Sequence, residues 1–177
     1  MLISALLLPL PLFARCPISP NGTLVLHAEV GNLIVDTSGT DAVEVEVADK
    51  QMKVQENCGR DIVKIEGTRP AGNGIPDWKI RVPRTVNLDL VAHVGRITVM
   101  GDTDGSVDLR ANGPVSAGNI RGRANIVSLT DNVRAGRIDG RAELRSIGNL
   151  NVGSVSDRKS TRLNSSHSAK SRMPSSA

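Results

Sequence analysis

Glycine recurs at a nearly constant interval in the second half of this 177-residue chain. Successive glycines lie 17 or 18 residues apart in two series: Gly101, Gly118, Gly136 and Gly153, and Gly105, Gly122 and Gly140. Such a period is typical of architectures in which one short unit of secondary structure stacks on the next. A unit of this length cannot bury an apolar face by itself, whereas stacked units share one continuous core. This spacing constrains the possible folds more than any other feature of the sequence.

Four units can be aligned on these glycines: residues 86–105, 106–122, 123–140 and 141–156. Each has a short apolar strand, a turn rich in Gly, Asn or Asp, and a second apolar strand. The apolar residues are aliphatic, since the chain has one Phe, one Trp and no Tyr. A narrow column of stacked strands accommodates Val, Ile, Leu and Ala better than aromatic rings. The sequence therefore predicts an all-β, single-stranded parallel β-helix (β-solenoid). The alternative is an up-and-down β-sandwich in which the regular glycine spacing is a coincidence.

The first half of the chain also consists of short strands, although their register cannot be aligned. Residues 42–47 alternate strictly, with Val43, Val45 and Val47 on one face and two glutamates on the other. This period of two is typical of a half-buried strand. We expect further strands at residues 23–30, 32–36, 52–54, 62–65 and 78–82, and one β-solenoid domain over 16–156.

The N-terminal residues 1–14 are apolar and uncharged. A transmembrane helix needs about 20 such residues, and two prolines interrupt this stretch. It therefore predicts a secretory signal peptide over 1–15, cleaved between Ala14 and Cys16; a buried strand is the alternative. Lipidation at Cys16 is disfavoured because Arg15 stands where a small residue is expected. A Cys16–Cys58 disulfide would suit an oxidising compartment, provided that Cys16 survives cleavage.

Residues 157–177 differ from the rest of the chain, being rich in serine and basic residues. Two stretches, 157–167 and 171–177, resemble consecutive translated parts of a short-read sequencing adapter. We therefore treat 157–177 as a disordered tail outside the fold and expect the natural C-terminus to be truncated near Ser156.

Excluding this tail changes the charge of the chain. The whole sequence carries 22 basic and 18 acidic residues, a net charge of +4, and the tail holds five of the basic residues and one of the acidic ones. The remaining 17 of each leave residues 1–156 neutral. Because aromatic residues for base stacking are also scarce, we expect no nucleic-acid partner.

Several segments resemble the bacterial putative-adhesin family of β-helical envelope domains. They are residues 24–35, Ile80–Pro83, residues 94–99, and the later Ala-Gly-x-Ile-x-Gly and Gly-Asn-Leu-Asn-Val steps. The resemblance covers roughly residues 20–156. It implies a right-handed β-helix that is exported to the periplasm, the outer envelope or the cell exterior, and it supplies no catalytic residues.

The densest acidic group is Asp102, Asp104 and Asp108. It superficially resembles a calcium loop but lacks both end ligands, so a solvated turn is the better interpretation. His27 and His93 are isolated, and no spacing matches a zinc site. We assign no catalytic, cofactor-binding or metal-ligating residue and expect no cofactor.

Arginine is concentrated in the last third of the domain: Arg110, Arg121, Arg123, Arg134, Arg137, Arg141 and Arg145. These residues could form a face for anionic glycans or lipids, but we favour a solvated surface with cross-strand Arg–Asp pairs.

The resulting hypothesis is a non-enzymatic protein with a structural or adhesive role at the bacterial cell envelope. Its partner would be a cell-surface glycan or an envelope protein, and any membrane contact would come only from the leader or a lipid anchor. The alternatives are an envelope regulatory ectodomain and a glycan-active β-helix enzyme.

Overall fold

The computed structural model describes residues 12–39, 41–47, 49, 51–69, 74–156 and 162–165. These residues form 16 strands and no helix, so the prediction of an all-β protein is confirmed. Among them, no helix has the length and apolarity needed to cross a membrane.

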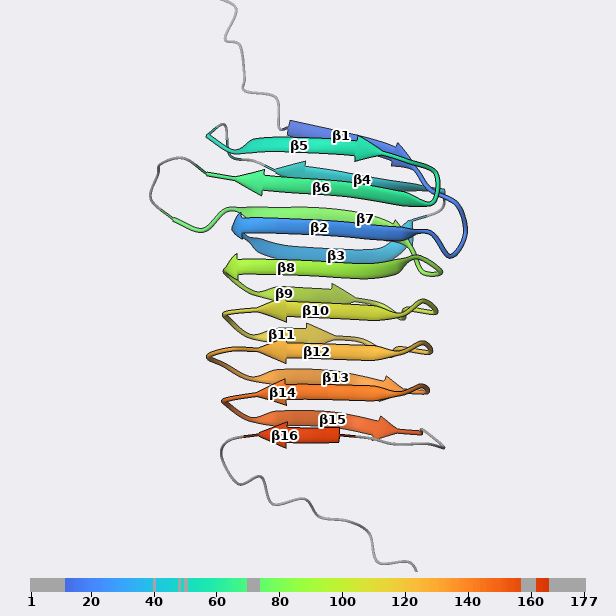
Figure 1. Cartoon of the computed structure of the whole chain (residues 1–177), viewed down its shortest axis with the longest axis vertical. Coiled ribbons are helices and arrows are strands. Elements are labelled where there is room, and N and C mark those ends of the chain that lie inside the picture. The colour runs from blue at the N-terminus through green and yellow to red at the C-terminus, as the bar shows by residue number, and fades with distance from the viewer. Residues whose placement is uncertain are drawn as a thin grey trace, which may run out of the picture.

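The strands form two layers, which lie one in front of the other in Figure 1. Sheet A contains, in spatial order, β1 (Leu12–Pro17), β4 (Ala42–Val47), β7 (Asp77–Pro83), β3 (Asn32–Gly39), β9 (Ile97–Met100), β11 (Val115–Ala117), β13 (Val133–Ile138) and β15 (Leu150–Val155). Sheet B contains β16 (Arg162–Ser165), β14 (Ala142–Ser146), β12 (Ala124–Ser128), β10 (Val107–Ala111), β8 (Asn87–Val94), β2 (Thr23–Val30), β6 (Ile62–Thr68) and β5 (Lys53–Cys58).

The prediction of a single-stranded parallel β-helix is wrong, and the right-handed winding expected with it has no support. The chain forms two separate mixed sheets, in which β4 is antiparallel to both β1 and β7, and β5 is antiparallel to β6. The physical reason is that alternation of apolar and polar residues shows which side chains face inward but not the direction of the neighbouring strand. The glycine spacing that suggested parallel stacking covers only residues 86–156, beyond these reversals.

From β8 to β15 the chain alternates between the two sheets, and neighbouring strands within each sheet are parallel. In sheet B, Leu109 lies opposite Ile126, which lies opposite Leu144. These partners are 17 and 18 residues apart, and each aligned unit contributes one strand to each sheet.

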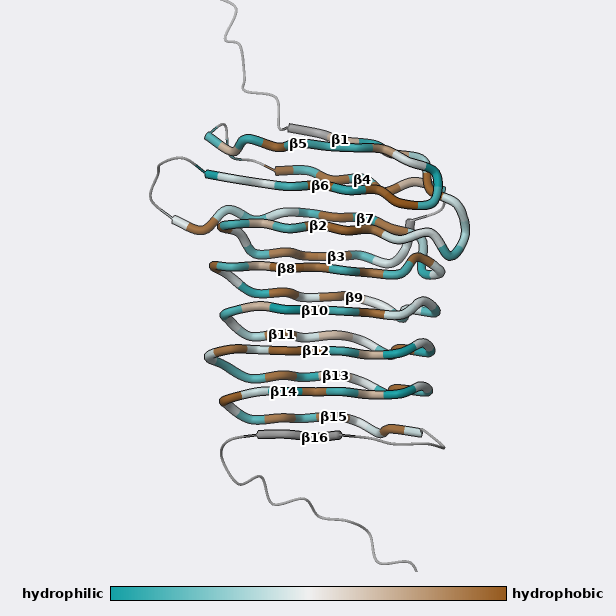
Figure 2. The backbone as a smooth tube through the Cα atoms, in the orientation of Figure 1, coloured by the Kyte–Doolittle hydropathy of each residue, from teal (hydrophilic) through white to brown (hydrophobic). Residues whose placement is uncertain are grey.

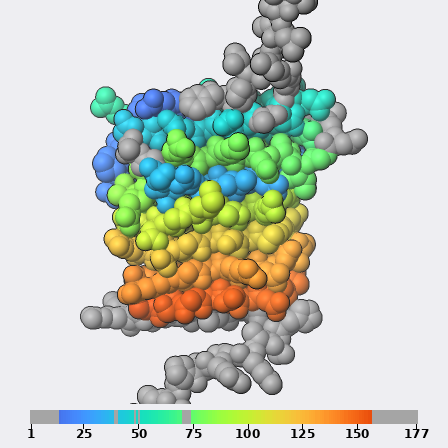
Figure 3. Space-filling model, turned by 180° about the vertical axis from the view of Figure 1, so that it is seen from behind, coloured from blue at the N-terminus to red at the C-terminus, as the bar shows by residue number. Residues whose placement is uncertain are grey.

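The spatial order of the strands departs from their order in the chain. Strand β2 lies between β6 and β8, and β3 lies between β7 and β9. Figure 3 shows the consequence, because the blue band of β3 is enclosed by green and yellow-green residues from later in the chain. The segment from β4 to β7 therefore extends beyond β2 and β3 toward one end of the stack, and the chain then returns to form β8.

The core lies between the two sheets and is aliphatic. Leu24, Leu26, Leu90 and Leu109 are fully buried on β2, β8 and β10, and these strands carry brown, hydrophobic stretches in Figure 2. Trp78, the one tryptophan of the chain, is also fully buried.

Glycine is needed at the turns because successive turns stack closely. A Cβ atom added to Gly122 would lie 2.5 Å from the carbonyl oxygen of Gly105, and one added to Gly113 would lie 2.5 Å from that of Gly95. Real Cβ atoms do not approach carbonyl oxygens so closely. The regular interval between glycines therefore arises because each turn lies against the backbone of the preceding turn.

Both ends of the described chain bear on predictions. Strand β1 begins at Leu12 and pairs with β4, so four residues of the predicted signal peptide belong to sheet A; residues 1–11 lie outside the described residues. Strand β16 pairs with β14, so four residues of the segment predicted as a disordered tail are part of sheet B. The other residues of 157–177 lie outside the described residues.

Candidate functional site

The outer face of sheet A carries a shallow hollow with a volume of about 350 Å³. Its lining comes from four adjacent strands: Glu44 and Glu46 on β4, Lys79, Ile80 and Arg81 on β7, Ile34 and Asp36 on β3, and Met100 on β9. No two of these strands that are neighbours in the sheet are consecutive in the chain.

Strand alternation explains why these side chains face outward. On β4, Val45 and Val47 are buried in the core, so Glu44 and Glu46 face the solvent side. On β7, the burial of Trp78, Ile80 and Val82 leaves Lys79 and Arg81 outside by the same rule.

The strand register arranges the charges in rows across the sheet. In one row Arg15, Glu44, Arg81 and Asp36 lie opposite one another in turn, so positive and negative charges alternate. The guanidinium groups of Arg15 and Arg81 each lie 3.5 Å from the Glu44 carboxylate. Cross-strand pairs of opposite charge stabilise a sheet modestly. The row ends at Met100, which lies opposite Asp36.

A second row runs beside the first and places Glu46, Lys79 and Ile34 opposite one another. Ile34 is half-buried, and Met100 is 48% exposed. The hollow thus combines charged groups of both signs with an apolar part. It can make both polar and apolar contacts with a partner.

The three aspartates of the predicted acidic group point to different partners. Asp102 accepts a hydrogen bond from Asn119, and Asp104 forms ion pairs with Arg84 at 2.8 Å and Arg121 at 3.1 Å. Asp108 accepts hydrogen bonds from Arg110 and Asn125. Each of these three carboxylates therefore has polar partners of its own.

The arginines of the last third do not form one face. Four pair with carboxylates: Arg110 with Asp108, Arg121 with Asp104, Arg137 with Asp139, and Arg145 with Glu143. Arg110 and Arg145 lie on sheet B, whereas Arg134 is an exposed residue of β13 in sheet A. The hydrogen bond from Arg137, with a second from Ser156, lowers the pKa of Asp139 below its ordinary value of 3.8.

The histidines at positions 27 and 93 lie on sheet B. His27 is half-buried on β2 opposite Glu66 of β6, and His93 is exposed on β8. The hydrogen bond and charge of Lys64 lower the pKa of Glu66, with a smaller contribution from His27. This carboxylate is therefore held in its ionised form.

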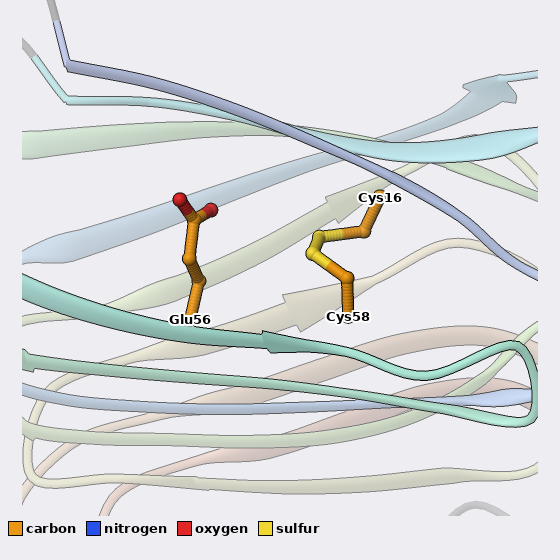
Figure 4. A group of neighbouring side chains, drawn as sticks. All are labelled: Cys16, Glu56 and Cys58. Carbon is orange, nitrogen blue, oxygen red and sulfur yellow. A yellow bond between two sulfur atoms is a disulfide. The ribbon is translucent and has the colours of Figure 1, made fainter.

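The two cysteines form the disulfide that the sequence left open. Cys16 on β1 is bonded to Cys58 on β5, and their Cα atoms are 5.3 Å apart. The bond joins the edge strand of sheet A to the edge strand of sheet B. Figure 4 shows Glu56 beside it, rising from the same strand as Cys58. The ligand atoms of Cys16, Cys58 and Glu56 all lie within 4.8 Å of one another.

Sequence reasoning identified neither the hollow nor this three-residue cluster. Alternation on β4 and β7 already indicated that Glu44, Glu46, Lys79 and Arg81 face outward. It did not indicate that β7 lies between β4 and β3, and the hollow depends on that order.

No protein-family model matches the chain, and no curated protein sequence matches it. Among solved structures, it is similar to a putative cell adhesion protein from Clostridium sporogenes, with 12% identity over 83% of this chain and 95% of that one, at a TM-score of 0.40. A putative lipid binding protein from Parabacteroides distasonis is 13% identical over 82% of this chain and 67% of that one, at 0.47. A putative adhesin from the same organism is 11% identical over 83% and 77%, at 0.32. Likeness at this level assigns neither a family nor a function.

Proposed function

We propose that the chain is a non-enzymatic, exported protein with a structural or adhesive role at the bacterial cell envelope. The hollow on sheet A is the surface through which it contacts an envelope protein. The observation that carries this proposal is that one hollow combines charged side chains of both signs with the exposed side chain of Met100. Methionine is adaptable at binding surfaces, and the hollow has no aromatic ring of the kind that sugar clefts use.

Export is supported by the Cys16–Cys58 disulfide, because disulfides persist mainly in oxidising compartments.

The test measures binding of the purified full chain to envelopes isolated from the producing bacterium, by sedimentation over a range of concentrations. Lys79→Glu reverses a charge in the hollow, and we expect it to weaken binding at least about tenfold, equivalent to about 1.4 kcal/mol. Lys64→Glu is the matched control, since it also reverses an exposed lysine beside a glutamate, but on sheet B.

Equal binding by the two variants would refute the hollow as the contact surface. Incubation of the chain with envelope polysaccharides addresses catalysis separately. We expect no release of new reducing ends, and their appearance at a rate proportional to protein concentration would refute the non-enzymatic role.

A further inference from the structure

The Cys16, Glu56 and Cys58 cluster occupies one end of the stack, where both sheets terminate. Strand β1 is the edge of sheet A and β5 is the edge of sheet B, and in the described residues each of them pairs with one strand within its sheet. The cluster is thus the place where the last strand of one layer is joined to the last strand of the other.

Local strand geometry brings the carboxylate to the sulfurs. Glu56 and Cys58 are two residues apart on β5, so their side chains leave the same face of the strand. Figure 4 shows both side chains rising from β5 toward β1, from which Cys16 descends. Cys16 is fully buried, whereas Glu56 and Cys58 are exposed. An ion can therefore approach the cluster from the β5 side.

The spacing of the three ligand atoms suits a small divalent cation once the sulfurs are free. Tetrahedral zinc binds sulfur at about 2.3 Å and carboxylate oxygen at about 2.0 to 2.2 Å, which places its ligand atoms about 3.5 to 4 Å apart. The sulfur and carboxylate oxygen atoms here all lie within 4.8 Å of one another. A set of two thiolates and a carboxylate leaves the fourth position for water.

We propose that the reduced form of this cluster is a Zn²⁺ site, so that reduction exchanges a covalent link between β1 and β5 for a metal link. A dithiol reductant supplies two electrons and two protons: the S–S bond breaks, Cys16 and Cys58 become thiols, and the reductant becomes a cyclic disulfide. Zinc then binds both sulfurs and the Glu56 carboxylate, and the two thiol protons pass to water. This inference goes beyond the proposed function and does not depend on it.

The test uses the full chain, reduced with a dithiol that is then removed by gel filtration under anaerobic conditions. Co²⁺ is the spectroscopic probe, because cobalt–thiolate bonds absorb in the near ultraviolet and four-coordinate Co²⁺ absorbs in the visible region. We expect the reduced chain to bind one Co²⁺ and Zn²⁺ to displace it. We expect the oxidised chain mixed with Co²⁺ to show neither absorption. Equal binding by oxidised and reduced protein would overturn the proposal.

Variants assign the ligands. Glu56→Gln keeps both cysteines and the disulfide, so its folding can be checked in the oxidised form before reduction. We expect it to weaken Zn²⁺ binding by about tenfold or more, in line with the losses seen when groups around a metal are removed. Glu66→Gln is the matched control, a carboxylate of β6 that pairs with Lys64. If Glu56→Gln binds zinc as tightly as Glu66→Gln, the carboxylate is not a ligand and the three-residue site is refuted.

Discussion

At the scale of single residues, charged side chains pair in two ways: with a residue two positions away, as Arg110 does with Asp108, or with a residue on the neighbouring turn. Arg84 and Arg121 both contact Asp104, and Arg121 also acts on Asp139 one turn further along the stack. Such pairs contribute little to stability one by one. At Asp139 the hydrogen bond from Arg137 lowers the pKa of the carboxyl group, which has a measurable consequence.

Replacing Arg137 by alanine should raise the pKa of Asp139 toward 3.8, because Arg137 makes the largest contribution to lowering it. A lowered native pKa stabilises the fold above the unfolded pKa, and this contribution is lost as the pH falls through the native value. In the variant Asp139 no longer adds this stability at neutral pH, so less stability should be lost as the pH falls below 3.8. Carboxyl carbon shifts followed by NMR titration measure the pKa directly. An unchanged pKa in Arg137→Ala would contradict the assignment of the pair.

At the scale of the strand, the inward and outward sets of side chains follow from alternation, and they were predictable. Val43, Val45 and Val47 are buried as their pattern indicates, and β2 and β4 match the predicted strand bounds. Strand β5 was predicted only as residues 52–54 but runs from Lys53 to Cys58. Its polar sequence hides it from a hydrophobic pattern, because an edge strand has less apolar surface to bury.

Two leucines test whether the core column or the turns carry the stability of the stack. Leu109 is fully buried on β10, whereas Leu129, just after β12, is 55% exposed. Leu109→Ala should lower the free energy of unfolding by about 2 to 5 kcal/mol, from lost burial and the cavity left behind. Leu129→Ala makes the same chemical change at the surface and should cost less than about 0.5 kcal/mol. Denaturant titration measures the free energy of unfolding of both variants. Similar losses of this free energy would show that the aliphatic side chains between the sheets are not the main core.

At the scale of the whole molecule, the disulfide fastens one end of a long stack of strands. It joins two edge strands across a sequence separation of 42 residues, and β1 has only β4 beside it in sheet A. The far end of sheet A is β15, whose residues are partly or fully exposed. Stability should therefore vary along the stack, and the Cys16–Cys58 bond should determine it at one end.

Replacing both cysteines by serine should lower the free energy of unfolding by about 2 to 4 kcal/mol, the effect expected from releasing a loop of this length. Amide hydrogen exchange should accelerate most in β1 and β5, whereas β10 and β12 should change least, because partial opening proceeds from the ends of such a stack. Exchange measured by mass spectrometry resolves the strands. Uniform acceleration along the chain would instead mean that the stack unfolds as one unit.

The sequence by itself determined the all-β class, the inward side chains of most strands and the regular interval of the turns. These properties depend on residues near in the chain, through strand alternation and the steric demands of tight turns. Only the tertiary structure decided that the strands form two mixed sheets, that β2 and β3 each lie between two strands from later in the chain, and that Cys16 is bonded to Cys58. Strand direction and order are set by pairing between distant segments with equally suitable apolar faces. Alternation is the same for either direction of a strand and for any neighbour, so neither could be read from the pattern.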